Sequence, residues 1–201
     1  MNRVIVALVL LALLLSRPAA AQSDGDQFQL GVQLAGAVSS EFDSTDIGVG
    51  GRFSWHPTAL LGAEAEVDFY PDDFADQPAF SRSRVEGMFG VTVGPRIGRL
   101  RPFGKLRPGF VIFRDAPAPF ACILIFPPPL SCALAGGETV FALDFGGGVE
   151  LFPTGRTFVR VDAGDRVVRY PSPVLARDGT AREDAFFSHD FRFAIGGGVR
   201  F

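Results

Sequence analysis

The chain of 201 residues is poor in the residue types that build several common functional sites. It has two cysteines and two histidines, too few for a four-thiolate zinc site or a disulfide scaffold. Lysine occurs once, at Lys105, and the net charge is −3, so the basic footprint of a nucleic-acid-binding protein is missing. We therefore expect no metal, no cofactor and no nucleic-acid partner. At 47 % hydrophobic residues, the chain can nevertheless form one packed domain.

A long apolar run is also missing. The longest one, residues 4–15, has 12 residues, which is too short to span a bilayer as a helix. It follows the basic Arg3 and ends before the sequence Ala19-Ala20-Ala21. This arrangement is typical of a secretory signal peptide. We expect a signal peptide at residues 1–21, a short segment at 22–26 and one folded domain at 27–201, in an oxidising compartment outside the cytoplasm.

The rest of the chain shows no convincing helical period and instead alternates between apolar and polar residues. Around Arg52, for example, Ile47, Val49 and Phe53 alternate with polar or glycine positions. Such a period of two predicts strands with one apolar face. We expect eight strands, near 27–38, 46–56, 61–70, 84–93, 102–114, 141–151, 159–164 and 191–201. In the fifth, Phe103 and Lys105 fit the pattern poorly and Pro108 lacks a backbone donor, so a bulge or edge irregularity is expected.

The connections between these strands alternate in length. Short ones are expected near 57–60, 97–101 and 153–156, and mostly longer ones near 39–45, 71–81, 114–138 and 171–186. An even number of antiparallel strands with short turns at one end and long loops at the other is typical of outer-membrane barrels. The fold class is therefore predicted as all-β, an eight-stranded antiparallel up-and-down transmembrane β-barrel.

Alternation by itself does not show which face points inward. The polar face is rich in glycine, which suits a crowded eight-stranded lumen better than a water-facing strand. The apolar face carries many Phe and Val side chains, which are too bulky for so narrow an interior. We therefore expect the charges to form an ion-pair network inside the barrel, with no wide pore. Its expected members are Arg52, Glu64, Glu66, Asp68, Arg84, Glu86, Arg107, Asp144, Glu150, Arg160, Asp162, Arg192 and Arg200, and Asp190 also lies on this face.

The ending F-R-F-A-I-G-G-G-V-R-F resembles the C-terminal strand of bacterial outer-membrane β-barrels. With eight strands and a signal peptide, the chain is similar to the outer-membrane protein A/X-type barrel domain over residues 27–201. The resemblance implies a Gram-negative outer membrane with both termini periplasmic, a monomer, and contact with outer-membrane lipid and lipopolysaccharide. It also implies that Phe201, Val199 and Ile195 form the signal read by the barrel-insertion machinery, so that removing Phe201 should lower insertion.

Two groups of residues resemble catalytic sites. Glu64 and Glu66 could act as general acid and base, but an ion-pair network explains them more simply. Ser188-His189-Asp190 contains the residue types of a hydrolase triad, but adjacent strand residues point to opposite faces, so the three cannot meet. We expect no catalytic residues and no enzyme. His56, beside Trp55, is expected at the membrane interface.

The third long connection, 114–138, is nearly uncharged and rich in proline, which excludes a continuous transmembrane helix. It could extend as a hairpin towards a surface partner, or it could fold over the barrel mouth. Its cysteines, Cys122 and Cys132, are expected to form a disulfide, because secreted thiols tend to pair. The function expected for the whole protein is structural or surface interaction. The alternatives are a small diffusion channel and, less favoured, a lipid-modifying enzyme.

Overall fold

The computed structural model describes residues 27–41, 44–71, 83–114, 126–176 and 178–201. The expected signal peptide, the segment 22–26 and Cys122 lie outside these residues. Within them the chain forms ten strands and one short helix: β1 (Phe28–Ser39), β2 (Ser44–Trp55), β3 (Leu61–Tyr70), β4 (Arg84–Val93), β5 (Leu100–Phe113), α2 (Leu130–Ala135), β6 (Thr139–Leu151), β7 (Thr157–Tyr170), β8 (Val174–Leu175), β9 (Ala181–Arg182) and β10 (Phe186–Arg200).

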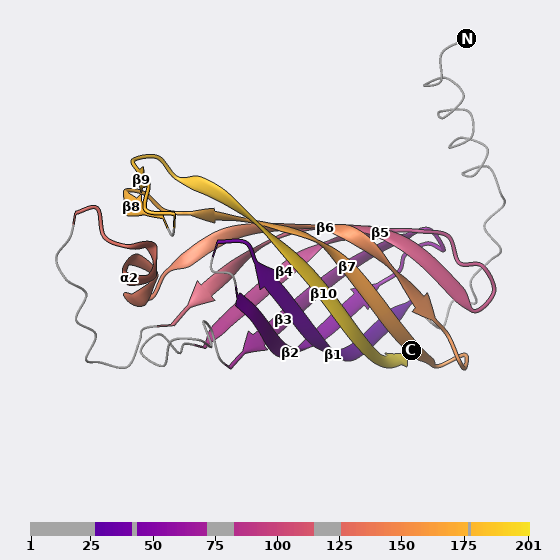
Figure 1. Ribbon diagram of the computed structural model, residues 1–201. Coiled ribbons are helices and arrows are strands. Elements are labelled where there is room, and N and C mark those ends of the chain that lie inside the picture. The colour runs from indigo at the N-terminus through magenta and orange to yellow at the C-terminus, as the bar shows by residue number, and fades with distance from the viewer. Residues whose placement is uncertain (1–26, 42–43, 72–82, 115–125, 177) are drawn as a thin grey trace, which may run out of the picture.

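Eight of the strands form a closed antiparallel barrel in the order β1-β10-β7-β6-β5-β4-β3-β2 (Figure 1). Each strand pairs with its neighbour in sequence, and β1 closes the barrel on β10. At the seam, Phe28 and Phe201 exchange two backbone hydrogen bonds, each 3.0 Å long. Closure leaves no strand of the barrel with unpaired edge groups. The predicted fold class is confirmed.

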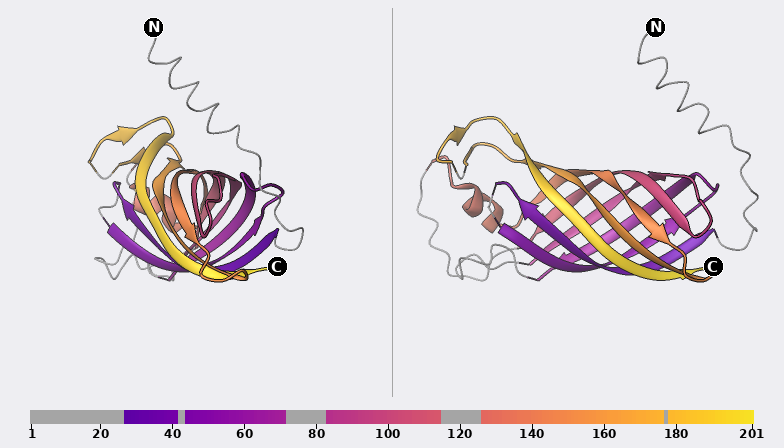
Figure 2. Two further views of the ribbon diagram at one scale, coloured as in Figure 1. Left: turned by 90° about the vertical axis from the view of Figure 1, so that its right-hand side faces the viewer. Right: turned by 45° about the vertical axis from the view of Figure 1, so that its right-hand side comes forward.

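The two faces of each strand separate as expected. In β1 the Val32 side chain is 74 % exposed, while its neighbour Gln33 is 5 % exposed and points inward. The same alternation places large apolar side chains on the outside of all eight strands. Figure 2 shows the strands curving around a common interior. The polar face is therefore the inner one.

Inward glycines let neighbouring strands approach one another. A Cβ atom at Gly198 in β10 would lie 2.0 Å from the carbonyl oxygen of Leu30 in β1, which is closer than real atoms come. The glycine runs 146–148 and 196–198 lie in β6 and β10, which run in the same direction. Strands β1 and β10 can therefore lie this close at Gly198 only because glycine has no side chain.

Some strand boundaries differ from the prediction: β7 continues to Tyr170 and β10 begins at Phe186, well beyond the predicted 159–164 and 191–201. The first outer connection has only four residues, 40–43, because β1 and β2 extend further than the alternation indicated. In β5 the register with β4 is the same on both sides of Pro108, so there is no bulge, but the ladder to β4 lacks the pairs of Pro108 and Arg107, which is an irregularity of the expected kind. Phe103 and Lys105 point inward on the same face as Arg107. They fit the pattern after all, because the small lumen accepts an aromatic ring and an ammonium group.

The helix α2 and the two-stranded sheet β8–β9 lie at the end of the barrel that carries the long connections (Figures 1 and 2). The alternation gave no sign of α2. Leu130 and Leu134 of α2 are buried in an apolar cluster with side chains inside the barrel mouth, among them Phe113 and Tyr170. This connection therefore folds over the mouth in its described part, and the expected hairpin is not formed there. Among the described residues, no helix combines the length and the apolar character needed to cross a membrane.

Candidate functional site

The interior of the barrel holds equal numbers of basic and acidic side chains. Nine basic residues are buried there: Arg52, Arg84, Arg101, Lys105, Arg107, Arg160, Arg166, Arg192 and Arg200. Nine acidic residues accompany them: Asp46, Glu64, Glu66, Asp68, Glu86, Asp144, Glu150, Asp162 and Asp190. Each is at most 5 % exposed. Because an unpaired buried charge is very costly, this balance is what a densely filled lumen requires.

Glu66 is the centre of the network. Its Oε2 accepts hydrogen bonds from Arg52 Nη2 and Arg107 Nη1, both at 2.7 Å, and its Oε1 pairs with Arg192. These partners come from β2, β5 and β10, so a carboxylate on β3 joins strands on several sides of the barrel. Arg107 continues the network through Glu64 at 3.0 Å and through Asp144. The result is a set of charge-assisted bonds across the middle of the lumen.

A second part of the network surrounds Arg160. Its guanidinium donates to Glu64 at 2.7 and 3.1 Å and to Asp162 at 2.9 Å, and it lies 4.1 Å from the centre of the Phe103 ring. The only lysine of the chain, Lys105, donates to Asp162 at 2.6 Å. Arg160 also donates to Glu150 at 3.3 Å, so its guanidinium is held by three carboxylates and an aromatic face, a combination that fixes its geometry.

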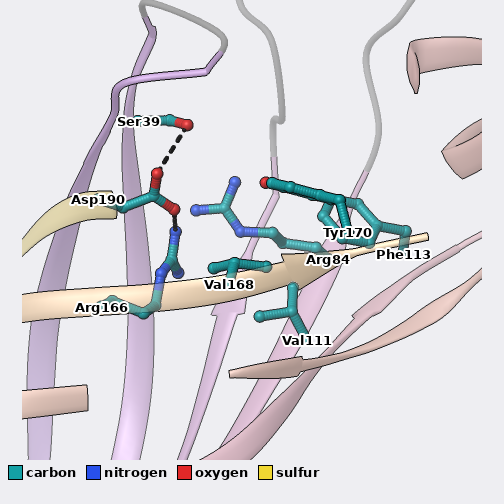
Figure 3. A pocket seen from close by; sticks show the side chains of 8 residues that line it. All are labelled: Ser39, Arg84, Val111, Phe113, Arg166, Val168, Tyr170 and Asp190. Atoms are coloured by element: carbon teal, nitrogen blue, oxygen red, sulfur yellow. Dashed lines mark hydrogen bonds and ion pairs between the residues drawn. The ribbon is translucent and has the colours of Figure 1, made fainter. Parts of the chain in front are cut away.

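Towards the mouth covered by α2, the network continues around Arg84 and Arg166. Arg84 Nη1 donates to Asp46 at 2.5 Å, and Arg166 Nη2 donates to Asp190 at 2.6 Å. Arg84, Arg166 and Asp190 line a cavity of about 10 Å³, shown in Figure 3 with Ser39, Val111, Phe113, Val168 and Tyr170. Such a volume holds about one water molecule.

At the opposite end of the lumen, His56 turns inward from the connection between β2 and β3. Arg101 Nη1 donates to His56 Nε2 at 2.7 Å, and Arg101 also donates to Thr92 and Glu150, at 3.2 Å each. A guanidinium only donates, so Nε2 must accept and the ring is neutral. Gly62 makes room for the imidazole, since a Cβ atom there would lie 2.8 Å from His56 Cδ2. The predicted interfacial position of His56 is therefore wrong.

Protonation of His56 is opposed by its surroundings. Burial lowers the pKa of His56 from 6.5 to about 4, and the charge of Arg101 adds to the effect. Between these two values the unfolded chain binds a proton that the folded chain does not, so the free energy of unfolding falls as the pH drops through this window. We expect the urea midpoint of the wild type to fall more between pH 7 and pH 4 than that of His56→Gln. Equal falls in the two proteins would contradict the assignment.

The structure brings the residues of the predicted network together. Ion pairs join the members from Arg52 to Arg192 to one another or to other lumen residues, and the guanidinium of Arg200 lies 4.8 Å from the centre of the Phe152 ring. Sequence reasoning missed Arg101, Lys105, Arg166, Asp46 and His56 as members. Extending the alternation by a few residues at the strand ends would have found Arg101 and Arg166. Asp46 and His56 alternate in step with Arg52 in the predicted strand 46–56, so the pattern already placed both on the inner face, and the sequence reasoning left them out of the network.

The residue types of a hydrolase triad do not meet. Ser188 and Asp190 point into the lumen, where Ser188 Oγ donates to Asp190 Oδ1 at 3.3 Å. His189 points outward, and its Nδ1 lies 2.6 Å from Asp165 Oδ2. The carboxylates Glu64 and Glu66 are each held by arginines. Among the described residues there is also no group of three His, Cys, Asp or Glu side chains that could hold a metal ion.

The fold and the charged lumen together define a class of protein, the small eight-stranded outer-membrane β-barrel, and comparison with solved structures supports this class. The chain is similar to Neisserial surface protein A, NspA, with a TM-score of 0.52, 15 % identity, and coverage of 90 % of this chain and 100 % of that one. It is also similar to the N-terminal β-barrel domain of Pseudomonas aeruginosa OprF, with a TM-score of 0.51, 11 % identity, and coverage of 88 % and 99 %.

The sequence comparisons add no closer relationship. No protein-family model matches the chain, and no curated protein matches it. At 11 and 15 % identity the similarity to the two barrels concerns the fold alone. The resemblance predicted from the C-terminal strand is confirmed at that level.

Proposed function

We propose that the protein is an integral barrel of the bacterial outer membrane with a sealed lumen, serving a structural or surface-interaction role. The belt of outward apolar side chains supports the membrane location, because a water-soluble protein rarely exposes so large an apolar surface. The short turns and both described chain ends lie at one end of the barrel, as the hydrogen bonds from His56 to Gln27 and from Arg200 to Arg156 show. In the proposed orientation that end is periplasmic and α2 is outside the cell.

The observation that carries the proposal is the complete filling of the lumen by paired charges. Arg107, Arg160 and Arg192 are at most 1 % exposed, and each is held by several carboxylates. An ion would have to separate these pairs to pass. The alternative function, a small diffusion channel, is therefore less favoured than a sealed barrel. The absence of a triad among the described residues equally disfavours a lipid-modifying enzyme, and we propose that the protein is not an enzyme.

The partners proposed for this barrel follow from its location. They are outer-membrane lipid and lipopolysaccharide along the belt and the insertion machinery during assembly, with Phe201 at the seam where the barrel closes. A surface partner would meet the connection 114–138, in which Phe126 is 85 % exposed. Cys132 belongs to α2 in this connection. Its pairing with Cys122, like the monomeric state, remains a prediction.

Two measurements test the proposal together. We expect the mature protein to fractionate with outer membranes and to migrate differently on a gel before and after boiling, because a folded barrel resists detergent. In planar bilayers it should show no steps at the nanosiemens scale, since the paired charges block the lumen.

Recovery in the soluble periplasmic fraction without detergent would overturn the membrane location. Steady conductance steps at the nanosiemens scale from the heat-modifiable form would instead agree with the membrane location but show that the protein is a channel. Conductance that appears in Arg107→Gln but not in the wild type would show directly that the paired charges seal the lumen.

A further inference from the structure

The outer faces of the barrel strands carry three charged or titratable side chains among the residues that the structure describes. They are Asp165 and Arg169 on β7 and His189 on β10. The other outward positions hold apolar, glycine, proline or threonine residues. The sequence pattern placed His189 on the face opposite to Asp190 but missed Asp165 and Arg169, because β7 extends well beyond its predicted end. We call Asp165, Arg169 and His189 the outer polar patch.

The members of this patch are close neighbours on two paired strands. His189 lies opposite Val167, so Asp165 and Arg169 flank it on the two diagonals. Diagonal neighbours on one face of a sheet lie about 7–8 Å apart, within reach of long side chains. His189 Nδ1 and Asp165 Oδ2 are 2.6 Å apart. Arg169 has no hydrogen-bond or ion-pair partner among the described residues, so its guanidinium is available to a ligand.

The position of Arg169 on β7 places it near the outer edge of the apolar belt. It is the last outward residue before the long connection that follows Tyr170, and its register partners are Phe141 and Phe187. Aromatic side chains gather where a membrane meets water, and an arginine at that depth extends its guanidinium towards the headgroups. Asp165 lies four residues deeper, about 13 Å along the strand at ~3.3 Å per residue.

We propose that Arg169, with His189 beside it, binds the phosphate of a lipid headgroup in the outer leaflet. A planar guanidinium matches phosphate oxygens in a bidentate arrangement, and the pair is strong where water is scarce. Asp165 acts as a positioning residue that fixes the imidazole ring. The inference rests on the proposed outer-membrane location, because it needs the end with long connections to face the outer leaflet.

A second copy of the chain fits this surface less well. Two barrels related by a two-fold axis along the membrane normal would meet with residues of equal depth facing one another. Arg169 would then oppose Arg169 and Asp165 would oppose Asp165, and like charges repel. A phosphate is complementary to the unpaired guanidinium, so the lipid headgroup is the favoured occupant.

Native mass spectrometry of the folded, full-length mature barrel in detergent tests this site, with diphosphorylated lipid A as the probe and its dephosphorylated form for comparison. We expect the wild type to retain the phosphorylated form preferentially and Arg169→Gln to lower its affinity about tenfold, as the loss of a charge-assisted pair implies. Arg169→Lys should lower the affinity less, because lysine keeps the positive charge but cannot donate two parallel hydrogen bonds to a phosphate. Arg156→Gln, which alters an exposed arginine at the opposite end of the barrel, is the matched control and should bind like the wild type.

Three results would overturn the inference. They are equal lipid A binding by Arg169→Gln and the wild type, equal binding of the two lipid forms, or a dimer of the wild type that Arg169→Gln abolishes. The gel shift on boiling is measured first for every variant. A barrel that shifts but does not prefer the phosphorylated lipid contradicts the site alone, whereas a wild type that is soluble and does not shift contradicts the proposed function.

Discussion

Replacing Glu66 by glutamine is expected to lower the free energy of unfolding by about 3–5 kcal/mol, as the removal of one partner from a buried ion-pair network does. The substitution keeps the size of the side chain and removes only its charge. Arg52, Arg107 and Arg192 would then share one carboxylate fewer, in a lumen where the charges otherwise balance. The midpoint of urea unfolding in lipid vesicles, followed by the gel shift of the folded barrel, measures the effect.

Glu183→Gln provides the matched control, because Glu183 is exposed and lies in the connection before β10. A surface change of this kind alters stability by no more than about 0.5 kcal/mol. Equal losses at the two positions would show that Glu66 faces outward or that its charge is not needed. A loss confined to Glu66 agrees with the inward polar face.

The second large effect is expected on the outside of the barrel. Leu34 lies in the middle of β1, with its side chain 54 % exposed on the apolar face. Leu34→Arg should cost about 2–4 kcal/mol, since a guanidinium near the centre of the bilayer loses its hydration. The same urea titration in vesicles measures this cost, with the variant first shown to fold in detergent.

The depth dependence of the cost is the more specific test. Val38, also outward on β1, lies near the outer end of the strand. Val38→Arg should cost only about 0–1 kcal/mol, because its charge can reach the headgroups. An equal cost at both positions would speak against a bilayer around the barrel, and negligible costs at both would indicate that this face meets water.

Much of the architecture could be predicted because strand alternation is a local property. In β3, Glu64 and Glu66 alternate with Ala63 and Ala65, and that alternation is sufficient to assign them to one face. The glycines on that face indicated the inner side, because a narrow lumen has little space for side chains. Strands β7 and β10 were predicted too short. Asp165 and His189 place polar side chains on the outer face and so interrupt the alternation near the strand ends.

The sequence by itself therefore determined the strands, the face that each side chain takes and the end of the barrel that carries the long connections. Only the tertiary structure decided which charges meet. Glu66 and Arg192 are 126 residues apart and pair because closure of β1 on β10 fixes which strands face one another across the lumen. The contact of Arg101 with His56, the docking of α2 on the apolar mouth and the outer polar patch likewise depend on neighbours distant in sequence. Alternation records the face of a residue but not its partner, because the partner is set by the register of the whole closed sheet.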